Sequence, residues 1–281
     1  MMEAKPSRTA TRVAMRRAAH QLLDRPLVFE DPLAERILGS WAKERLHEDI
    51  KSETPYGVQM RAWLAARSRL AEDMLAEAVA DGTRQYVVLG AGMDTFGYRN
   101  PWGDVRVFEV DFPATQAWKQ ELLASTSIFV PETVTFAPVD FERESLAEGL
   151  GRVGFRREEP AFFSWLGVTM YLARETTLGT LRGVEQSCAR NGICFDYMAP
   201  RETLGLRARF AFDRLASRVA AAGEPFVGFF APEQLAALVR EMGYARVEDW
   251  NAARLNARYF ADRVDGLRVA GSLGNIMCAR G

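Results

Sequence analysis

The chain is poor in the residues from which many metal and redox sites are built. It has three cysteines and two histidines among 281 residues. That is too few for a disulfide framework, a zinc cluster or a histidine-rich metal centre, and it disfavours a Ser-His-Asp triad. We therefore expect no bound metal, and a protein of a reducing compartment, the cytoplasm.

Long apolar runs and an excess of one charge are missing as well. No stretch of 18 or more apolar residues occurs, which argues against a membrane span. The 36 basic residues are balanced by 37 acidic ones, and only four of the basic residues are lysines. Because the arginines are spread along the chain, no patch for nucleic-acid phosphates is indicated. We expect neither nucleic acid nor membrane as a partner, and the oligomeric state is left open.

Hydrophobic residues make up 48% of the chain, and their pattern changes along its length. Residues 1–83 have helical periodicity throughout, whereas short apolar runs alternate with helical stretches afterwards. Such alternation predicts an α/β fold with a doubly wound, Rossmann-like parallel sheet. The predicted strands are residues 85–89, 105–111, 134–139, 161–168, 193–197, 245–250 and 276–279.

We interpret the chain, residues 1–281, as one domain with four parts. The first part, residues 1–83, is a helical N-terminal cap that includes a helix at residues 33–38. Residues 84–200 form the nucleoside-binding half of the sheet. A lid-like helical insertion at residues 201–230 and a final segment, 231–281, that completes the sheet follow.

The turn after the first predicted strand carries the first sign of a ligand site. It reads Gly90-Ala91-Gly92, and a glycine after a strand can adopt a positive φ and admit a ligand close to the backbone. The third glycine of a dinucleotide fingerprint is replaced by Thr95. By itself this turn is as compatible with a plain tight turn as with a ligand loop.

Two acids at the ends of the next strands strengthen the ligand interpretation. Asp111 comes 21 residues after Gly90, where a carboxylate can accept hydrogen bonds from ribose hydroxyls. Asp140 ends the third strand, where it could accept from the adenine amine or cap the following helix, and Phe141 beside it offers an apolar flank. The three features suit a dinucleotide or S-adenosylmethionine, and the missing glycine favours the latter.

Four segments resemble the leucine carboxyl methyltransferase family, in particular its bacterial branch with polyketide O-methyltransferases of the tetracenomycin type. They are residues 25–38 (RPLVFEDPLAERIL), 87–99 (VVLGAGMDTFGYR), 107–113 (VFEVDFP) and 166–172 (LGVTMYL). The resemblance implies a class I methyltransferase sheet of seven strands, the last antiparallel, and S-adenosylmethionine as cofactor. It also implies that Gly90 lies under the methionine portion, with Ala91 and Gly92 in the same loop.

The resemblance assigns three further contacts. Asp111 would hold the ribose, Asp140 with Phe141 would frame the adenine, and Arg67 would pair with the cofactor's carboxylate. A guanidinium suits a carboxylate because both are planar and can form two parallel hydrogen bonds. One position departs from the family pattern: Leu166 stands where many relatives have an acid, so the contact of that acid is absent or supplied elsewhere.

The acceptor site is less well indicated, and no residue is assigned to catalysis. Tyr98, Tyr171 and Tyr197 near strand ends could orient an acceptor, and Arg201 on the insertion could hold an acidic one. We expect O-methylation of a small molecule such as a polyketide-type secondary metabolite, on a carboxylate or a phenol. A nicotinamide-dependent oxidoreductase and a non-catalytic cofactor-binding protein are the alternatives.

Overall fold

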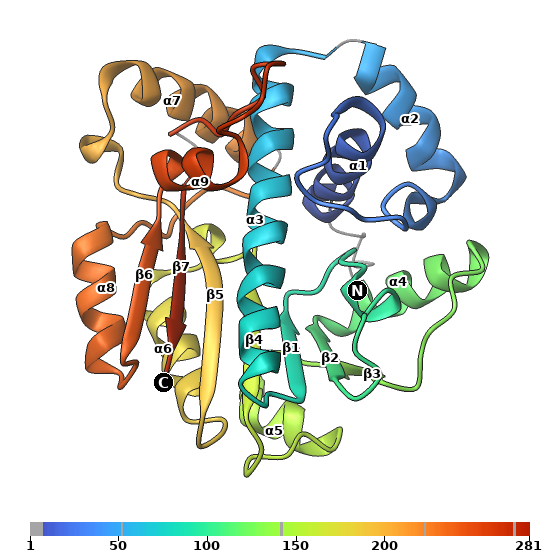
Figure 1. Cartoon of the computed structure of the whole chain (residues 1–281), viewed down its shortest axis with the longest axis vertical. Coiled ribbons are helices and arrows are strands. Elements are labelled where there is room, and N and C mark those ends of the chain that lie inside the picture. The colour runs from blue at the N-terminus through green and yellow to red at the C-terminus, as the bar shows by residue number, and fades with distance from the viewer. Residues whose placement is uncertain (1–7, 52, 141–142, 222, 272–273) are drawn as a thin grey trace.

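A mixed seven-stranded sheet forms the centre of the molecule in the computed structural model (Figure 1), which describes residues 8–51, 53–140, 143–221, 223–271 and 274–281. The strand order is β3-β2-β1-β4-β5-β7-β6. Strands β1 to β5 pair in parallel, and β7 is antiparallel to both of its neighbours. The predicted doubly wound sheet with an antiparallel last strand is confirmed. The strands are β1 (Gln85–Leu89), β2 (Arg106–Asp111), β3 (Val134–Pro138), β4 (Ala161–Trp165), β5 (Asn191–Tyr197), β6 (Arg246–Trp250) and β7 (Asn275–Arg280).

The two faces of the sheet are covered by different helices, and the alternation of side chains along β1 shows how. Tyr86 and Val88 belong to the apolar cluster that contains the long helix α3, whereas Val87 and Leu89 belong to the opposite cluster. That opposite cluster includes residues of α5, α6 and α8. Both faces are therefore buried, as a parallel sheet with crossover helices requires. The helices concerned are α3 (Pro55–Ala80), α4 (Pro113–Ser125), α5 (Leu146–Arg152), α6 (Arg174–Glu185) and α8 (Pro232–Glu241).

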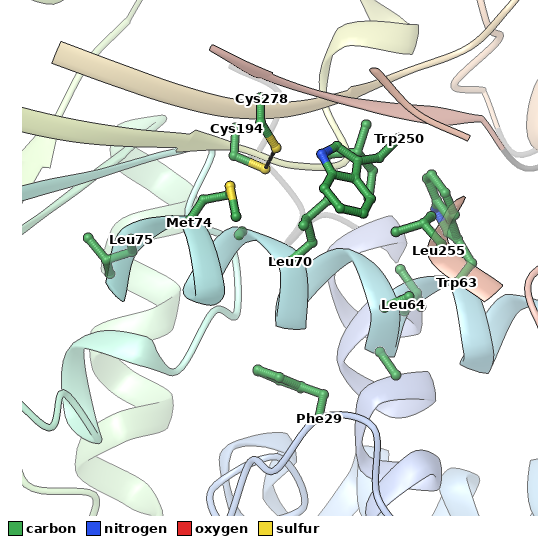
Figure 2. Packing of buried hydrophobic residues seen from close by; sticks show 14 of the residues in the cluster. Phe29, Trp63, Leu64, Leu70, Met74, Leu75, Cys194, Trp250, Leu255 and Cys278 are labelled. Atoms are coloured by element: carbon green, nitrogen blue, oxygen red, sulfur yellow. Dashed lines mark hydrogen bonds between the residues drawn. The ribbon is translucent and has the colours of Figure 1, made fainter. Parts of the chain in front are cut away.

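Helix α3 begins at a well-formed N-terminus and packs along the sheet. The Thr54 side chain accepts a hydrogen bond from the Gly57 amide, and Pro55 occupies the first turn, where its missing N–H costs nothing. Figure 2 shows its residues Leu70 and Met74 beside the strand pair β5–β7. The thiols of Cys194 and Cys278 face each other there across directly opposed positions, with their sulfurs 3.4 Å apart.

A group of helices lies toward one end of the sheet in Figure 1. They are α1 (Arg8–Leu23), α2 (Gly39–Lys51), α7 (Leu206–Ala221) and α9 (Ala252–Tyr259). The first two belong to the predicted cap, and α7 lies in the predicted insertion at residues 201–230. Because α1 and α7 are far apart in the sequence, only the fold brings them to the same end of the sheet.

Some local predictions are corrected. The helix expected at residues 33–38 is a turn followed by a short 3₁₀ helix, Arg36–Leu38. Asp31, just before this turn, is buried, accepts a hydrogen bond from the Leu33 amide at 3.1 Å and pairs with Arg17 at 2.7 Å. Strand β4 ends at Trp165 rather than at residue 168, because Gly167 turns the backbone out of the sheet with φ of +78°. Helix α9 was not predicted. Helix α2 was expected only as part of the helical residues 1–83, and α5 only as an unbounded helix after Asp140.

Among the residues that the structure describes, no helix has both the length and the apolar character needed to cross a bilayer. Among the same residues, no group of three or more histidine, cysteine, aspartate or glutamate side chains is arranged to hold a metal ion.

Candidate cofactor and acceptor cavity

A cavity of about 920 Å³ opens beyond the carboxyl ends of β1, β2 and β4. Strand order reverses between β1 and β4, since β2 and β3 lie to one side of β1 and β4 and β5 to the other. Ligands of doubly wound sheets bind at such a reversal, and this volume is typical of a small-molecule site. The remaining walls come from α1, α3 and residues 223–227, which follow α7.

The glycine turn forms the floor of this cavity beside β1. Gly90 has φ of +66°, and a Cβ at this position would lie 2.6 Å from a methyl carbon of Val168. Only glycine fits without displacing that valine. The amides of Gly90 and Ala91 donate to the Val110 carbonyl at 2.8 and 3.1 Å, so the turn is tied to β2. All three predicted loop residues, Gly90, Ala91 and Gly92, line the cavity.

Asp111 lines the cavity at the end of β2, as the sequence predicts. Its carboxylate accepts hydrogen bonds from the amides of Gly92 at 2.5 Å and Phe112 at 2.7 Å. Burial raises the pKa of Asp111, although these two hydrogen bonds act in the opposite direction. The carboxylate retains lone pairs for ligand hydroxyls, because each oxygen can accept more than one hydrogen bond.

Glu109, two residues earlier on β2, has a different role. Its carboxylate is fully buried and accepts hydrogen bonds from Lys119 at 2.6 Å and from the Tyr98 hydroxyl at 2.9 Å. Burial raises the pKa of Glu109, and the nearby Lys119 opposes that rise. Glu109 therefore belongs to an internal ion pair that joins β2 to α4.

The predicted adenine end is partly described. Asp140 lines the cavity, and Arg143 lies 3.4 Å from its carboxylate. Phe141 lies outside the described residues. Phe112 is an aromatic side chain that the sequence interpretation did not select: it lines the cavity with 47% of its surface exposed. Its place directly after Asp111, at the end of a strand, is the signal that could have identified it.

Arg67 projects from α3 into the cavity wall and is only 7% exposed. Its Nη1 donates to Asp196 at 2.7 Å. Its Nε finds no hydrogen-bond partner in the part of the chain that the structure describes. A buried N–H of a guanidinium without an acceptor is costly, so a ligand acceptor would complete this position.

Asp196 is the second residue that the sequence interpretation missed. It ends β5, is fully buried, and accepts a hydrogen bond from the Gly167 amide at 2.6 Å besides the one from Arg67. Leu166, which stands in place of the acid of many relatives, lines the cavity directly before Gly167. An acid on the neighbouring strand thus lies next to the position where the family acid is missing. No periodicity reveals this, because Asp196 and Leu166 are 30 residues apart and meet only in the sheet.

The fold places only one of the residues predicted to contact the acceptor at the cavity. Tyr171 lines the cavity, and burial, with Glu224 and Asp196 nearby, raises its pKa to about 12. The Tyr197 hydroxyl instead donates to Asp249 at 2.7 Å from a fully buried position. Burial raises the pKa of this phenol, as it does for Tyr98.

Tyr98, Tyr197 and Arg201 are not among the residues that line the cavity. The Tyr98 hydroxyl is held by Glu109, and the Arg201 guanidinium is exposed and pairs with Asp213 of α7 at 2.6 Å. A contact of these three residues with an acceptor therefore finds no support in this cavity, because each polar group already has an internal or surface partner elsewhere.

Helix α1 closes the cavity from above the glycine turn. Arg17 donates from Nη2 to the Met93 carbonyl at 2.6 Å and pairs with Asp31 at 2.7 Å. Asp31 also accepts a hydrogen bond from the Thr95 hydroxyl at 2.6 Å. This buried cluster fastens α1 to the turn and places the first residues of the helix, including Thr9 and Val13, on the cavity wall.

The sequence pattern of the family described as leucine carboxyl methyltransferase matches residues 10–185 of this chain. A Bacillus subtilis protein named as the S-adenosyl-L-methionine-dependent methyltransferase YktD is 28% identical over 291 residues, which cover 95% of each chain. The Mycobacterium tuberculosis protein Rv3787c, named in the same way, is 34% identical over 171 residues, 58% of this chain and 54% of that protein.

Solved structures show the same fold. A methyltransferase structure from Thermobifida fusca superposes with a TM-score of 0.56 at 18% identity and covers 88% of this chain and 92% of its own. A structure from the DUF574 family of Streptomyces avermitilis gives a TM-score of 0.55 at 18% identity, with 88% of this chain and 94% of its own covered. At these identities the likeness concerns the fold alone.

Proposed function

Since this chain belongs to the leucine carboxyl methyltransferase family and is an S-adenosylmethionine-dependent methyltransferase, we propose that it transfers the methyl group to an oxygen of a small molecule. The acceptor we propose is a phenol or a carboxylate of a polyketide-type secondary metabolite. A cytoplasmic location and the four-part division of a single domain are further parts of this proposal.

One observation carries the cofactor assignment. The buried Arg67 Nε without a partner and the cradle at Gly90, which a Cβ would fill, lie in the same cavity as Asp111 and Asp140. A carboxylate ligand group suits the guanidinium, and ribose hydroxyls and an adenine amine suit the two acids. We propose that Arg67, Asp111 and Asp140 hold the methionine carboxylate, the ribose and the adenine respectively.

Bound S-adenosylmethionine supplies a methyl carbon on a positively charged sulfur. The protein then has to align the acceptor oxygen with that carbon and exclude water. The cavity offers both, because α1 and residues 223–227 cover the end of the sheet. An ionised carboxylate needs no base, whereas a phenol, with a pKa of about 10, gains from a proton acceptor.

Isothermal titration with S-adenosylhomocysteine tests the cofactor site directly. We expect saturable binding to the wild-type protein and a loss of about tenfold or more in Asp111→Ala, because charge-assisted hydrogen bonds to the ribose are lost. NADH serves as the control ligand and should not bind. Absence of S-adenosylhomocysteine binding would refute the proposal.

Transfer of a labelled methyl group to a panel of phenols and carboxylic acids tests the reaction itself. Labelled product from a member of the panel would support O-methylation. Binding of the cofactor without transfer to any acceptor would instead favour the non-catalytic alternative.

A further inference from the structure

The side chain of Glu224 lines the cavity, and neither the sequence analysis nor the proposed cofactor contacts assign it a role. It follows α7 and lines the cavity together with Pro225 and Val227. Its Oε2 accepts a hydrogen bond from the hydroxyl of Thr9, near the start of α1. Two segments that are 215 positions apart in the sequence thus meet at this carboxylate.

The neighbours of Glu224 place it near the methionine end of the cofactor site. The Val227 amide donates a hydrogen bond to the Met170 carbonyl at 2.9 Å. The Tyr171 ring packs against Phe226, with their centroids 5.5 Å apart. These contacts hold the segment that contains Glu224 beside Tyr171, and Glu224, Tyr171 and Arg67 line the same cavity.

The charges in the cavity disfavour an anionic acceptor. Each of the three arginines that line it has a carboxylate partner: Arg17 pairs with Asp31, Arg67 with Asp196, and Arg143 lies by Asp140. Glu224, in contrast, accepts from the neutral hydroxyl of Thr9 and forms no ion pair with another residue that the structure describes. A substrate carboxylate placed beside Glu224 would meet a like charge.

Apolar side chains of the cavity suit a flat ring. Val13, Leu166, Leu172 and Val227 line the cavity with the Tyr171 ring. Cavities of this character bind aromatic ligands, with a few polar groups fixing their orientation.

We propose that Glu224 is the general base of this site and that the acceptor is a neutral phenol whose hydroxyl donates to the Glu224 carboxylate. The inference rests on the proposed function and narrows its acceptor from two classes to one. Thr9 is then a positioning residue, because its hydroxyl holds one oxygen of the carboxylate and leaves the other to face the acceptor.

Two bonds change at the methyl carbon during the transfer. The phenol oxygen forms a bond to the methyl carbon while the bond from that carbon to the sulfonium sulfur breaks, and its electron pair stays on sulfur as a neutral thioether. The phenol proton moves to Glu224, which later releases it to water. A carboxylate base of this kind contributes roughly a hundredfold or more to such a rate.

The test uses two probes of matched shape, 2-naphthol and 2-naphthoate, bound to the full-length protein in complex with S-adenosylhomocysteine. Titration calorimetry gives both affinities, and the ultraviolet spectrum of the bound naphthol reports whether it is neutral or ionised. The variants are Glu224→Gln and, as a matched control, Glu202→Gln. Glu202 is an exposed glutamate of the same insertion outside the cavity lining.

We expect the wild-type complex to bind neutral naphthol about tenfold or more tightly than naphthoate, because Glu224 repels the anion. Glu224→Gln should remove this preference without changing the affinity for S-adenosylhomocysteine, and Glu202→Gln should keep it. Equal or tighter binding of naphthoate, an unchanged preference in Glu224→Gln, or binding of neither probe would overturn the inference. Failure of S-adenosylhomocysteine itself to bind would instead overturn the proposed function.

Discussion

Arg67→Lys is the substitution that most directly examines the cofactor site. The Arg67 side chain is 8% exposed and shares a buried ion pair with Asp196. Lysine keeps the positive charge, so Asp196 is not left as an unpaired buried acid, whose cost would be about 3–5 kcal/mol. What lysine removes is the planar fork and with it the unpartnered Nε. The variant therefore separates ligand binding from folding.

The expected magnitude follows from the hydrogen bond that is lost. A hydrogen bond to a charged group contributes about 1.5–3 kcal/mol, and each 1.4 kcal/mol corresponds to about a tenfold change in affinity. The affinity for S-adenosylhomocysteine should therefore fall by about 10- to 150-fold. 5′-Methylthioadenosine, which lacks the amino acid portion, should bind with little change.

Calorimetric titration of both ligands provides the assay, and Arg61→Lys provides the matched control. Arg61 lies on the same helix, is 5% exposed, and donates to Asp24 at 2.6 Å away from the cavity lining. The control should lower the melting temperature and leave both affinities unchanged. If Arg67→Lys weakened the two ligands by the same factor, the assignment of Arg67 to the carboxylate would be refuted.

Gly90→Ala should weaken binding of S-adenosylhomocysteine, because φ of Gly90 is +66° and the new Cβ would lie 2.6 Å from a methyl carbon of Val168. Calorimetry measures this affinity, with Gly103→Ala as the control because the space around Gly103 is open. Equal affinities of the two variants would contradict the prediction. Lys119→Met should lower the free energy of unfolding by about 3–5 kcal/mol, since it leaves the buried Glu109 carboxylate without its cation. Urea denaturation measures this difference. A decrease in the free energy of unfolding below about 1 kcal/mol would show that the ion pair is dispensable. Lowering the pH from about 8 to about 4 should weaken binding of S-adenosylhomocysteine, because burial raises the pKa of Asp111 above its ordinary value of about 4 and ribose hydroxyls need the ionised form. Asp111→Asn should bind weakly with little dependence on pH, and an unchanged pH profile would remove Asp111 from the site.

The sheet was predictable because its strands carry strong local signals. Strands β1, β2, β4 and β5 are short, largely apolar runs bounded by turn residues or helical stretches, and a strand buried on both faces has that pattern. The edge strand β6, with the sequence RVEDW, is more polar and more exposed. The antiparallel direction of β7 came from the family resemblance, since no pattern within residues 275–280 encodes it. Helices α2, α5 and α9, for which the sequence predicted no bounds, are short or weakly apolar, with 13, 7 and 8 residues, so their stability depends on packing rather than on periodicity.

Only the part of the candidate site that lies at the ends of consecutive strands was predictable. Gly90, Asp111 and Asp140 follow consecutive strands, and the carboxyl ends of parallel strands meet at one edge of the sheet, so a linear pattern places them together. Tyr98 and Tyr197 also lie near strand ends, but their hydroxyls are held by Glu109 and Asp249. Proximity to a strand end along the chain does not tell which way a side chain is directed.

The sequence by itself determined the class of the fold, the family, and the part of the cavity built from turns after consecutive strands, because each depends on residues close together in the chain. Tertiary structure alone decided the partners of the charged groups. Asp196 reaches Arg67 across 129 positions and Thr9 reaches Glu224 across 215. Such distant pairs decide which acid accompanies each arginine of the cavity, and that balance of charge bears on which acceptor the cavity admits.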